Sequence, residues 1–201
     1  ERDMVQYQAI PVAAQRSPQH SGGVIDLSRR YAGADLRWTR QLRLADRPLT
    51  LVTGVAYDEL REDRRGYENF VGEQLGVKGA LRRNENNKVW NLDPYLQASW
   101  ALTESWTLDA GLRYSRIRFR SEDHYVEPGN ADDSGKATYR EWLPVGALRW
   151  TPTSDLTFYV SAGKGFETPT FNELSYRNDG LGGLNFALRP ATNVNVEVGA
   201  K

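Results

Sequence analysis

Six aromatic residues stand at the ends of stretches in which apolar and polar residues alternate, and this spacing restricts the possible folds most. They form three pairs: Trp90 with Trp100, Trp106 with Tyr114, and Trp142 with Trp150. Alternation is typical of a β-strand, whose successive side chains point to opposite faces, so both members of a pair share one face. The sequence therefore predicts strands that carry an aromatic residue at each end of one face.

The distance between paired aromatics is close to the thickness of a membrane. At about 3.3 Å per residue, Trp90 and Trp100 lie roughly 33 Å apart along a strand, and Trp142 and Trp150 roughly 26 Å apart. A tilt of about 40° reduces these lengths to roughly 25 and 20 Å, which matches the apolar band of a transmembrane β-barrel between its two aromatic girdles. The alternative is a soluble sandwich or lipocalin-like barrel, in which the tryptophans would pack in the core.

The composition agrees with membrane-crossing strands and excludes several other classes. Hydrophobic residues make up 39% of the 201 residues, and no stretch approaches the roughly 20 continuous apolar residues of a membrane helix. The 26 basic and 26 acidic residues balance, so the charge predicts no nucleic-acid partner. Cysteine is absent, which excludes disulfides, thiolate metal sites and thiol nucleophiles.

Seven segments have the pattern of strands. Five alternate clearly: residues 34–43, 90–100, 106–115, 156–163 and 193–198. Two more, residues 49–58 and 140–150, are apolar on both faces, as in a strand that is buried on both sides. Residues 1–28 carry weak signals, with one strand end before a polar loop. We predict an all-β, antiparallel meander of about seven strands.

The predicted connections alternate between short and long. Short turns fall at residues 45–48, 103–105 and 152–155, and long polar connections at about 61–86, 121–137 and 167–189. Transmembrane β-barrels have short turns on the periplasmic side and long loops outside. This asymmetry assigns Trp100, Trp106 and Trp150 to the inner girdle. It assigns Trp90, Tyr114 and Trp142 to the outer one.

Catalysis has little support in the sequence. His20 and His124 lie in polar loops, and neither has a second ligand at the spacing of a metal site. No Gly-x-Ser-x-Gly elbow is present, and residues 163–165 are not followed by the glycine and helix of a phosphate-binding loop. We therefore predict no enzyme activity, no metal site and no cofactor.

The long connections concentrate arginine and tyrosine, together with one histidine. Guanidinium groups bind anions through paired hydrogen bonds, and tyrosine rings stack on aromatic ligands, so we expect these loops to bind such a ligand. Ordinary solvated loop surface is the alternative. The predicted ligand-binding residues are Arg64, Tyr67, His124, Tyr125, Tyr176 and Arg177.

Five charged residues lie on the polar faces of the predicted strands. On a lipid-facing surface, a charged side chain costs about 2–4 kcal/mol at the bilayer midplane. We therefore expect these residues to point into a lumen, where they contact water, each other or a plug domain. They are Asp93, Asp109, Arg113, Lys164 and Glu197.

Residues 163–174, with the sequence Gly-Lys-Gly-Phe-Glu-Thr-Pro-Thr-Phe-Asn-Glu-Leu, resemble the strand-end motif of TonB-dependent outer-membrane receptors. Residues 188–190 and 196–201 resemble the next strand of that family, although Ala191 stands where glutamate is common. The resemblance extends over about residues 25–201. The motif residues are Gly163, Gly165, Phe166, Pro169, Asn172, Glu173 and Leu174.

The resemblance implies a 22-stranded barrel filled by an N-terminal plug. Residues 1–201 would be an internal fragment of its wall, without the plug and the remaining strands. The family imports scarce nutrients across the bacterial outer membrane, driven by the partner protein TonB, and makes or breaks no bond. We expect a ferric siderophore as cargo. A quinone cofactor or cobalamin is the alternative within the family, and a passive porin the alternative outside it.

About seven strands cannot close so wide a barrel, so the isolated fragment would leave two unpaired edges and an apolar face that contacts outer-membrane lipid. Unpaired strand edges are templates for pairing with another chain. We therefore expect the isolated fragment to associate with itself through these edges, to curl into a smaller barrel, or to require detergent.

Overall fold

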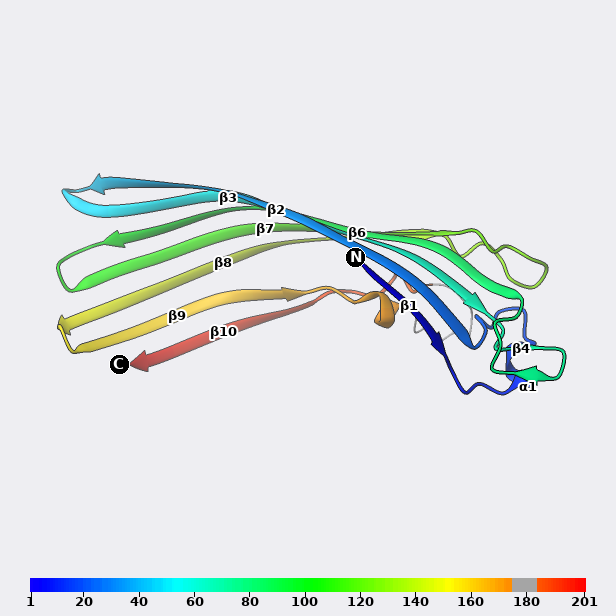
Figure 1. Ribbon diagram of the computed structural model, residues 1–201. Coiled ribbons are helices and arrows are strands. Elements are labelled where there is room, and N and C mark those ends of the chain that lie inside the picture. Colours follow the sequence, from blue (N-terminus) through cyan, green and yellow to red (C-terminus); the bar gives the residue numbers. More distant parts are fainter. Residues whose placement is uncertain (175–183) are drawn as a thin grey trace.

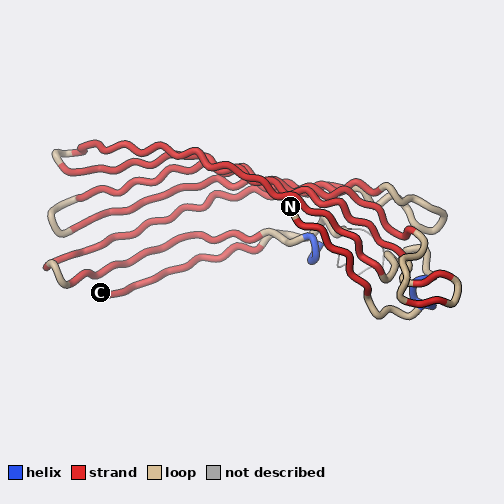
Figure 2. Tube along the Cα trace, in the orientation of Figure 1, coloured by secondary structure: helices blue, strands red, loops and turns tan. Residues whose placement is uncertain are grey.

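The computed structural model describes residues 1–174 and 184–201. These residues form one curved, open antiparallel sheet with the strand order β1-β2-β3-β6-β7-β8-β9-β10 (Figures 1 and 2). The strands of this sheet are β1 (Arg2–Tyr7), β2 (Val24–Leu44), β3 (Arg47–Tyr67), β6 (Leu81–Ala101), β7 (Trp106–Asp123), β8 (Gly135–Thr153), β9 (Leu156–Glu167) and β10 (Ala191–Ala200). A small hairpin, β4 (Phe70–Val71) with β5 (Gln74–Leu75), and two short helices, α1 (Val12–Gln15) and α2 (Phe171–Leu174), lie in the connections.

The predicted all-β antiparallel meander is confirmed. All seven expected strands are present as β2, β3, β6, β7, β8, β9 and β10, each paired with its neighbour along the chain. The weak signal near the N-terminus corresponds to β1, which pairs with β2 as an eighth strand. The sheet is not closed, and β1 and β10 are its two edges. None of the helices in residues 1–174 and 184–201 is long and apolar enough to cross a membrane.

The short turns lie where the sequence predicts them, at one end of the sheet (Figure 1). The β2–β3 turn consists of Ala45 and Asp46, which both have positive φ, at 51° and 59°. Such a two-residue turn matches the right-handed twist of the flanking strands. The long connections lie at the other end, but their predicted bounds are wrong. Residues 61–67 and 81–86, expected in a loop, belong to β3 and β6.

All six bracketing aromatics lie on one face of the sheet, here called the outward face. Trp106 stacks on Trp150 with 5.7 Å between ring centroids, and Trp150 stacks on Phe158 at 5.4 Å. At the opposite level, the rings of Tyr114 and Trp142 lie 4.8 Å apart. Cross-strand pairing places Trp90 and Trp100 on the same face.

The outward face is exposed rather than packed in a core. The exposed fraction is 56% for Trp142, 52% for Leu96 and 69% for Val196. The alternative of a soluble domain with its tryptophans in the core is therefore wrong. Contact of the six aromatics with lipid stays a prediction.

Candidate functional site on the inner face

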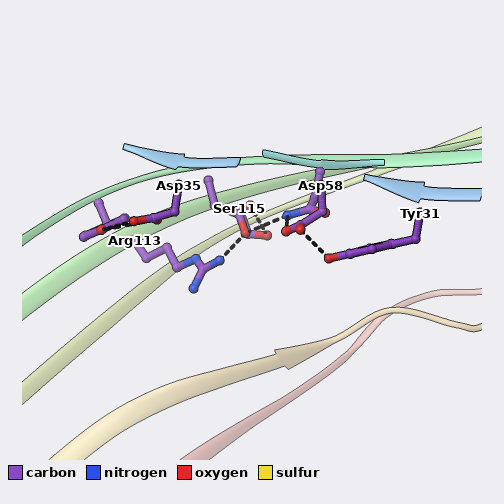
Figure 3. Close-up of polar contacts among 8 residues, drawn as sticks. Tyr31, Asp35, Asp58, Arg113 and Ser115 are labelled. Carbon is purple, nitrogen blue, oxygen red and sulfur yellow. Dashed lines mark hydrogen bonds and ion pairs between the residues drawn. The ribbon is translucent and has the colours of Figure 1, made fainter. Parts of the chain in front are cut away.

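The opposite side of the sheet, here called the inner face, carries a polar network centred on Asp93 of β6. Asp93 is 4% exposed. Its carboxylate accepts hydrogen bonds from Ser115 Oγ at 2.9 Å and Asn91 Nδ2 at 3.2 Å, and it pairs with the Arg113 guanidinium (Figure 3). A buried carboxylate is stable only with such partners, because burial removes its hydration. Alternation along β6 and β7 places these four residues on one face.

The network continues across β3 to β2. Asn91 Nδ2 also donates to Asp58 Oδ2 at 3.3 Å, and the Tyr31 hydroxyl donates to the other oxygen of Asp58 (Figure 3). The hydroxyl of Tyr95 lies 3.4 Å from Asp35 Oδ2. The chain of contacts therefore spans four strands, β2, β3, β6 and β7.

A depression of about 360 Å³ lies beside this network. It is lined by charged and aromatic side chains of the inner face, among them Asp35, Arg37, Tyr95 and Arg113. Two carboxylates of the network, Asp58 and Asp93, are already bonded to neighbours, whereas Arg37 forms no ion pair with a described residue. This arrangement offers hydrogen bonds and cation contacts to a polar molecule. The described residues contain no cluster of side chains that could hold a metal ion.

A second polar cluster lies on the same face nearer the long connections. Glu62 is 1% exposed and is held by Arg29 Nε at 2.5 Å and Asn87 Nδ2 at 3.3 Å. Asn87 also donates to Glu85, which pairs with Arg83 at 2.9 Å. Ion pairs thus replace apolar packing on this part of the inner face.

Four of the five charged residues expected to point into a lumen lie on the inner face of the sheet. Asp93 and Arg113 pair on the inner face, Asp109 lies 4.0 Å from Arg149, and Glu197 accepts from the Tyr159 hydroxyl at 2.5 Å. The amine of the fifth residue, Lys164, pairs at 2.7 Å with Glu141, which lies opposite Ser115 of the inner face in the β7–β8 register.

Four of the six predicted ligand-binding residues lie in the described part of the chain, in two separate places. Arg64 and Tyr67 lie in β3 rather than in a loop, which corrects their predicted placement. Burial, then the nearby charge of Arg83, lowers the pKa of Arg64. Tyr67 lies under the Lys78 ammonium at 3.9 Å.

His124 and Tyr125 lie in the β7–β8 connection, as predicted. The His124 imidazole is exposed, and its backbone N–H donates to Asn84 O at 2.8 Å. No hydrogen bond, ion pair or ring contact joins these two residues to Arg64 or Tyr67, all four of which are described. Tyr176 and Arg177 lie outside the described residues. Ligand binding by the six residues stays a prediction.

The 163–174 motif packs across the inner face of β7 and β8. Leu174 is fully buried in a cluster with Phe119, Ala137, Tyr139 and Leu184, and Phe166 contacts the edge of this cluster. The Tyr139 hydroxyl donates to the carbonyl of Leu188 at 3.0 Å. Leu174 and Leu184, which follow β9 in the chain, therefore pack against the inner face of β7 and β8.

The motif residues have distinct structural roles. Gly163, Gly165 and Phe166 lie in β9, Pro169 follows it, and Asn172, Glu173 and Leu174 form most of α2. A Cβ on Gly165 would lie 2.2 Å from Asn193 Oδ1, so a larger residue requires the Asn193 side chain on β10 to move. The backbone N–H and hydroxyl of Thr170 both donate to Glu173, at 2.7 and 2.9 Å. This is a capping box, which starts the helix and lowers the pKa of Glu173 through the Thr170 N–H.

Sequence reasoning missed two features that it had the means to find. The Thr-x-x-Glu spacing of residues 170–173 is the signal of a capping box. The Asp93–Arg113–Ser115 contact needed the β6–β7 register, which follows from the short 102–105 turn and the pairing of Leu96 with Leu112. Alternation in residues 34–43 predicts the direction of Asp35 in the same way, whereas Asp58 gave no such signal, because the polar residue Glu59 follows it.

A family model described as TonB dependent receptor-like, beta-barrel, matches residues 5–201. Solved structures share the fold at low sequence identity. The siderophore receptor PiuA from Acinetobacter baumannii is 14% identical with a TM-score of 0.70, covering 89% of this chain and 30% of its own. The ferric citrate transporter FecA, unliganded, is 15% identical with a TM-score of 0.67, covering 88% and 26%. The copper transporter OprC is 21% identical with a TM-score of 0.63, covering 88% and 28%.

Proposed function

The chain belongs to the TonB-dependent receptor family, as part of its β-barrel, and on that premise we propose that it is wall of an outer-membrane receptor that imports a ferric siderophore. The chain spans less than a third of the length of the structures it resembles. Energy coupling to TonB would act through a plug that fills the barrel. No bond is formed or broken in such transport.

The observation that carries this proposal is the polar inner face built on a sheet whose other face is apolar. The inner face combines a hydrogen-bonded network with cationic and aromatic groups at the 360 Å³ depression, including Arg37, which forms no ion pair with a described residue, and the ring of Tyr95. Many ferric siderophores are acidic or carry aromatic rings, and guanidinium and phenol groups bind both. Siderophore and ferric citrate receptors are among the structures with the same fold.

A receptor for another cargo is the second candidate. The copper transporter OprC has the same fold, so this fold also serves receptors whose cargo is not a ferric siderophore. A quinone cofactor or cobalamin would fit the same architecture. A passive porin is the third, and it would not depend on TonB.

Uptake by cells that express the intact receptor tests this function. Under iron limitation, accumulation of ⁵⁵Fe supplied as a panel of ferric siderophores is expected to require both the receptor gene and TonB. Accumulation that persists without TonB would indicate a porin. Iron uptake that is unchanged by deleting the receptor gene, with loss of copper, quinone or cobalamin uptake instead, would indicate the second candidate.

A pair of variants on β2 tests the inner face. R37Q is expected to raise the half-saturating siderophore concentration about fivefold to tenfold, because it removes one charge-assisted contact. R40Q removes the same charge from the outward face of the same strand, three residues away, and should leave uptake unchanged. Equal behaviour of the two variants would show that the inner face does not contact cargo.

A further inference from the structure

Basic residues occupy the outward face directly beyond the outer aromatics. Lys88, Arg116 and Arg140 are each two residues beyond an outer aromatic, Trp90, Tyr114 and Trp142 respectively. A step of two residues keeps the side chain on the same face. Three neighbouring strands therefore present a cation at the first outward position past the girdle.

Five cations also lie in one row across the sheet, here called the cation ladder. Each member is directly opposite the next in the β2–β3, β3–β6, β6–β7 and β7–β8 registers. Like charges in directly opposed positions destabilise a sheet. The ladder consists of Arg30, Arg61, Lys88, Arg120 and Lys136.

Nearby carboxylates compensate only part of this charge. Glu1 pairs with Arg30 at 2.9 Å, Glu59 is shared by Lys88 and Arg61, and Glu122 pairs with Arg120. Asp63 is the remaining acidic residue at the groove described below. Lys136 forms no ion pair within residues 1–174 and 184–201.

Three further arginines on this face have no acidic partner among the described residues. Arg116 and Arg140 are directly opposed, and Arg118 lies in the row between them and the ladder. The Arg116 guanidinium lies 5.5 Å from the centre of the Trp90 ring, and its Nε has no hydrogen-bond partner. This part of the outward face therefore carries eight basic side chains but only four carboxylates.

The ladder also forms the walls of a groove of about 450 Å³. Arg30, Arg61, Lys88 and Arg120 line it, so a group bound there is reached from four strands. A phosphate group accepts several hydrogen bonds at once and suits the planar fork of arginine.

We propose that the cation ladder, with Arg116, Arg118 and Arg140, binds phosphate groups of lipids in the outer leaflet. Headgroups lie just beyond an interfacial aromatic belt, which is where these cations are placed. Lipid phosphates would supply the negative charge that the directly opposed cations lack. The proposal depends on the outer-membrane placement given above and is independent of the cargo.

Binding of lipid A, which carries two phosphate groups, to the intact detergent-solubilised receptor tests this. Native mass spectrometry is expected to detect bound lipid A and much less of its dephosphorylated form. R118Q/R140Q removes two cations without breaking an ion pair and should weaken lipid A binding about tenfold to thirtyfold. R118K/R140K keeps both charges and should bind within about threefold of the wild type.

R37Q/R43Q is the matched control, because it removes two charges from the inner face of β2 and neither arginine forms an ion pair with a described residue. Lipid A binding to this variant should be unchanged, and all variants should unfold thermally as the wild type does in neutral detergent. Equal loss in the control and in R118Q/R140Q would overturn the proposal. Equal binding of the dephosphorylated lipid would do so as well, because the apolar face alone would then explain it. Displacement of lipid A by millimolar inorganic phosphate would indicate a site for a free anion and would also overturn it. Neither outcome of the lipid experiment decides whether the receptor imports iron, which the ⁵⁵Fe accumulation experiment tests separately.

Discussion

The two halves of the long strands follow different rules. β2, β3 and β6 each have 21 residues, which corresponds to roughly 70 Å and far exceeds the apolar band of a membrane. Near the short turns, apolar side chains dominate the outward face, whereas the inner face carries most of the polar ones. Near the long connections, most side chains on both faces of these three strands are polar, and the strands are joined by ion pairs such as Arg29–Glu62 and Lys88–Glu59. We expect contact of the outward face with lipid to account for the first half, and electrostatic pairing between strands explains the second.

The largest expected effect is that of a charge placed on the apolar half. Leu96→Arg puts a guanidinium on the outward face midway between the girdles and should destabilise the intact receptor in lipid bilayers by about 2–4 kcal/mol. Gln97→Arg places the same group one residue later, on the inner face, and should cost less than about 0.5 kcal/mol. Denaturant titration of both variants in vesicles measures the difference. Similar costs for both would mean that the outward face does not contact lipid.

A smaller effect is expected from the polar half. Glu62→Ala leaves Arg29 and Asn87 without their shared acceptor on the inner face and should cost about 2 kcal/mol. Asp63→Ala, at the adjacent exposed outward position, should change stability by no more than about 0.5 kcal/mol. The same denaturant titration applies. If the two variants are equally stable, the ion pairs of this half do not hold the strands together.

The contrast between the halves also explains what the sequence predicted. Alternation identifies a strand when one face must be apolar, so the segments 90–100 and 106–115 are predicted as strands, and their ends at the connecting turn agree with β6 and β7 to within one residue. Residues 61–67 have polar side chains on both faces, and their composition is the same as that of a solvated loop. Their strand structure comes from pairing with residues far along the chain, which composition does not encode.

Some contacts of the candidate site likewise follow from the sequence, and others do not. The inward direction of Asp93 and Arg113 follows from the period of two, and their contact follows once the β6–β7 register is known. The Tyr31–Asp58 contact links β2 to β3 across 27 residues, and nothing local to either residue predicts it.

The smallest expected effect concerns α2, whose Leu174 packs against the inner face of β7 and β8 near the long connections. Glu173 accepts the Thr170 N–H, which keeps the pKa of Glu173 below its ordinary value of 4.5. A carboxyl whose pKa is depressed in the folded state stabilises that state above its unfolded pKa, and the stabilisation is lost as the pH falls through the folded value. The hydrogen-exchange protection factor of the Leu174 amide, which donates to Thr170 O at 2.9 Å, should therefore fall below pH 4.5 in the intact receptor. Glu173→Gln should lower this protection at neutral pH and remove its dependence on pH, whereas Glu167→Gln, at the exposed end of β9, should retain the wild-type profile. A pH dependence that survives in Glu173→Gln would show that the titration of another group controls the stability of α2.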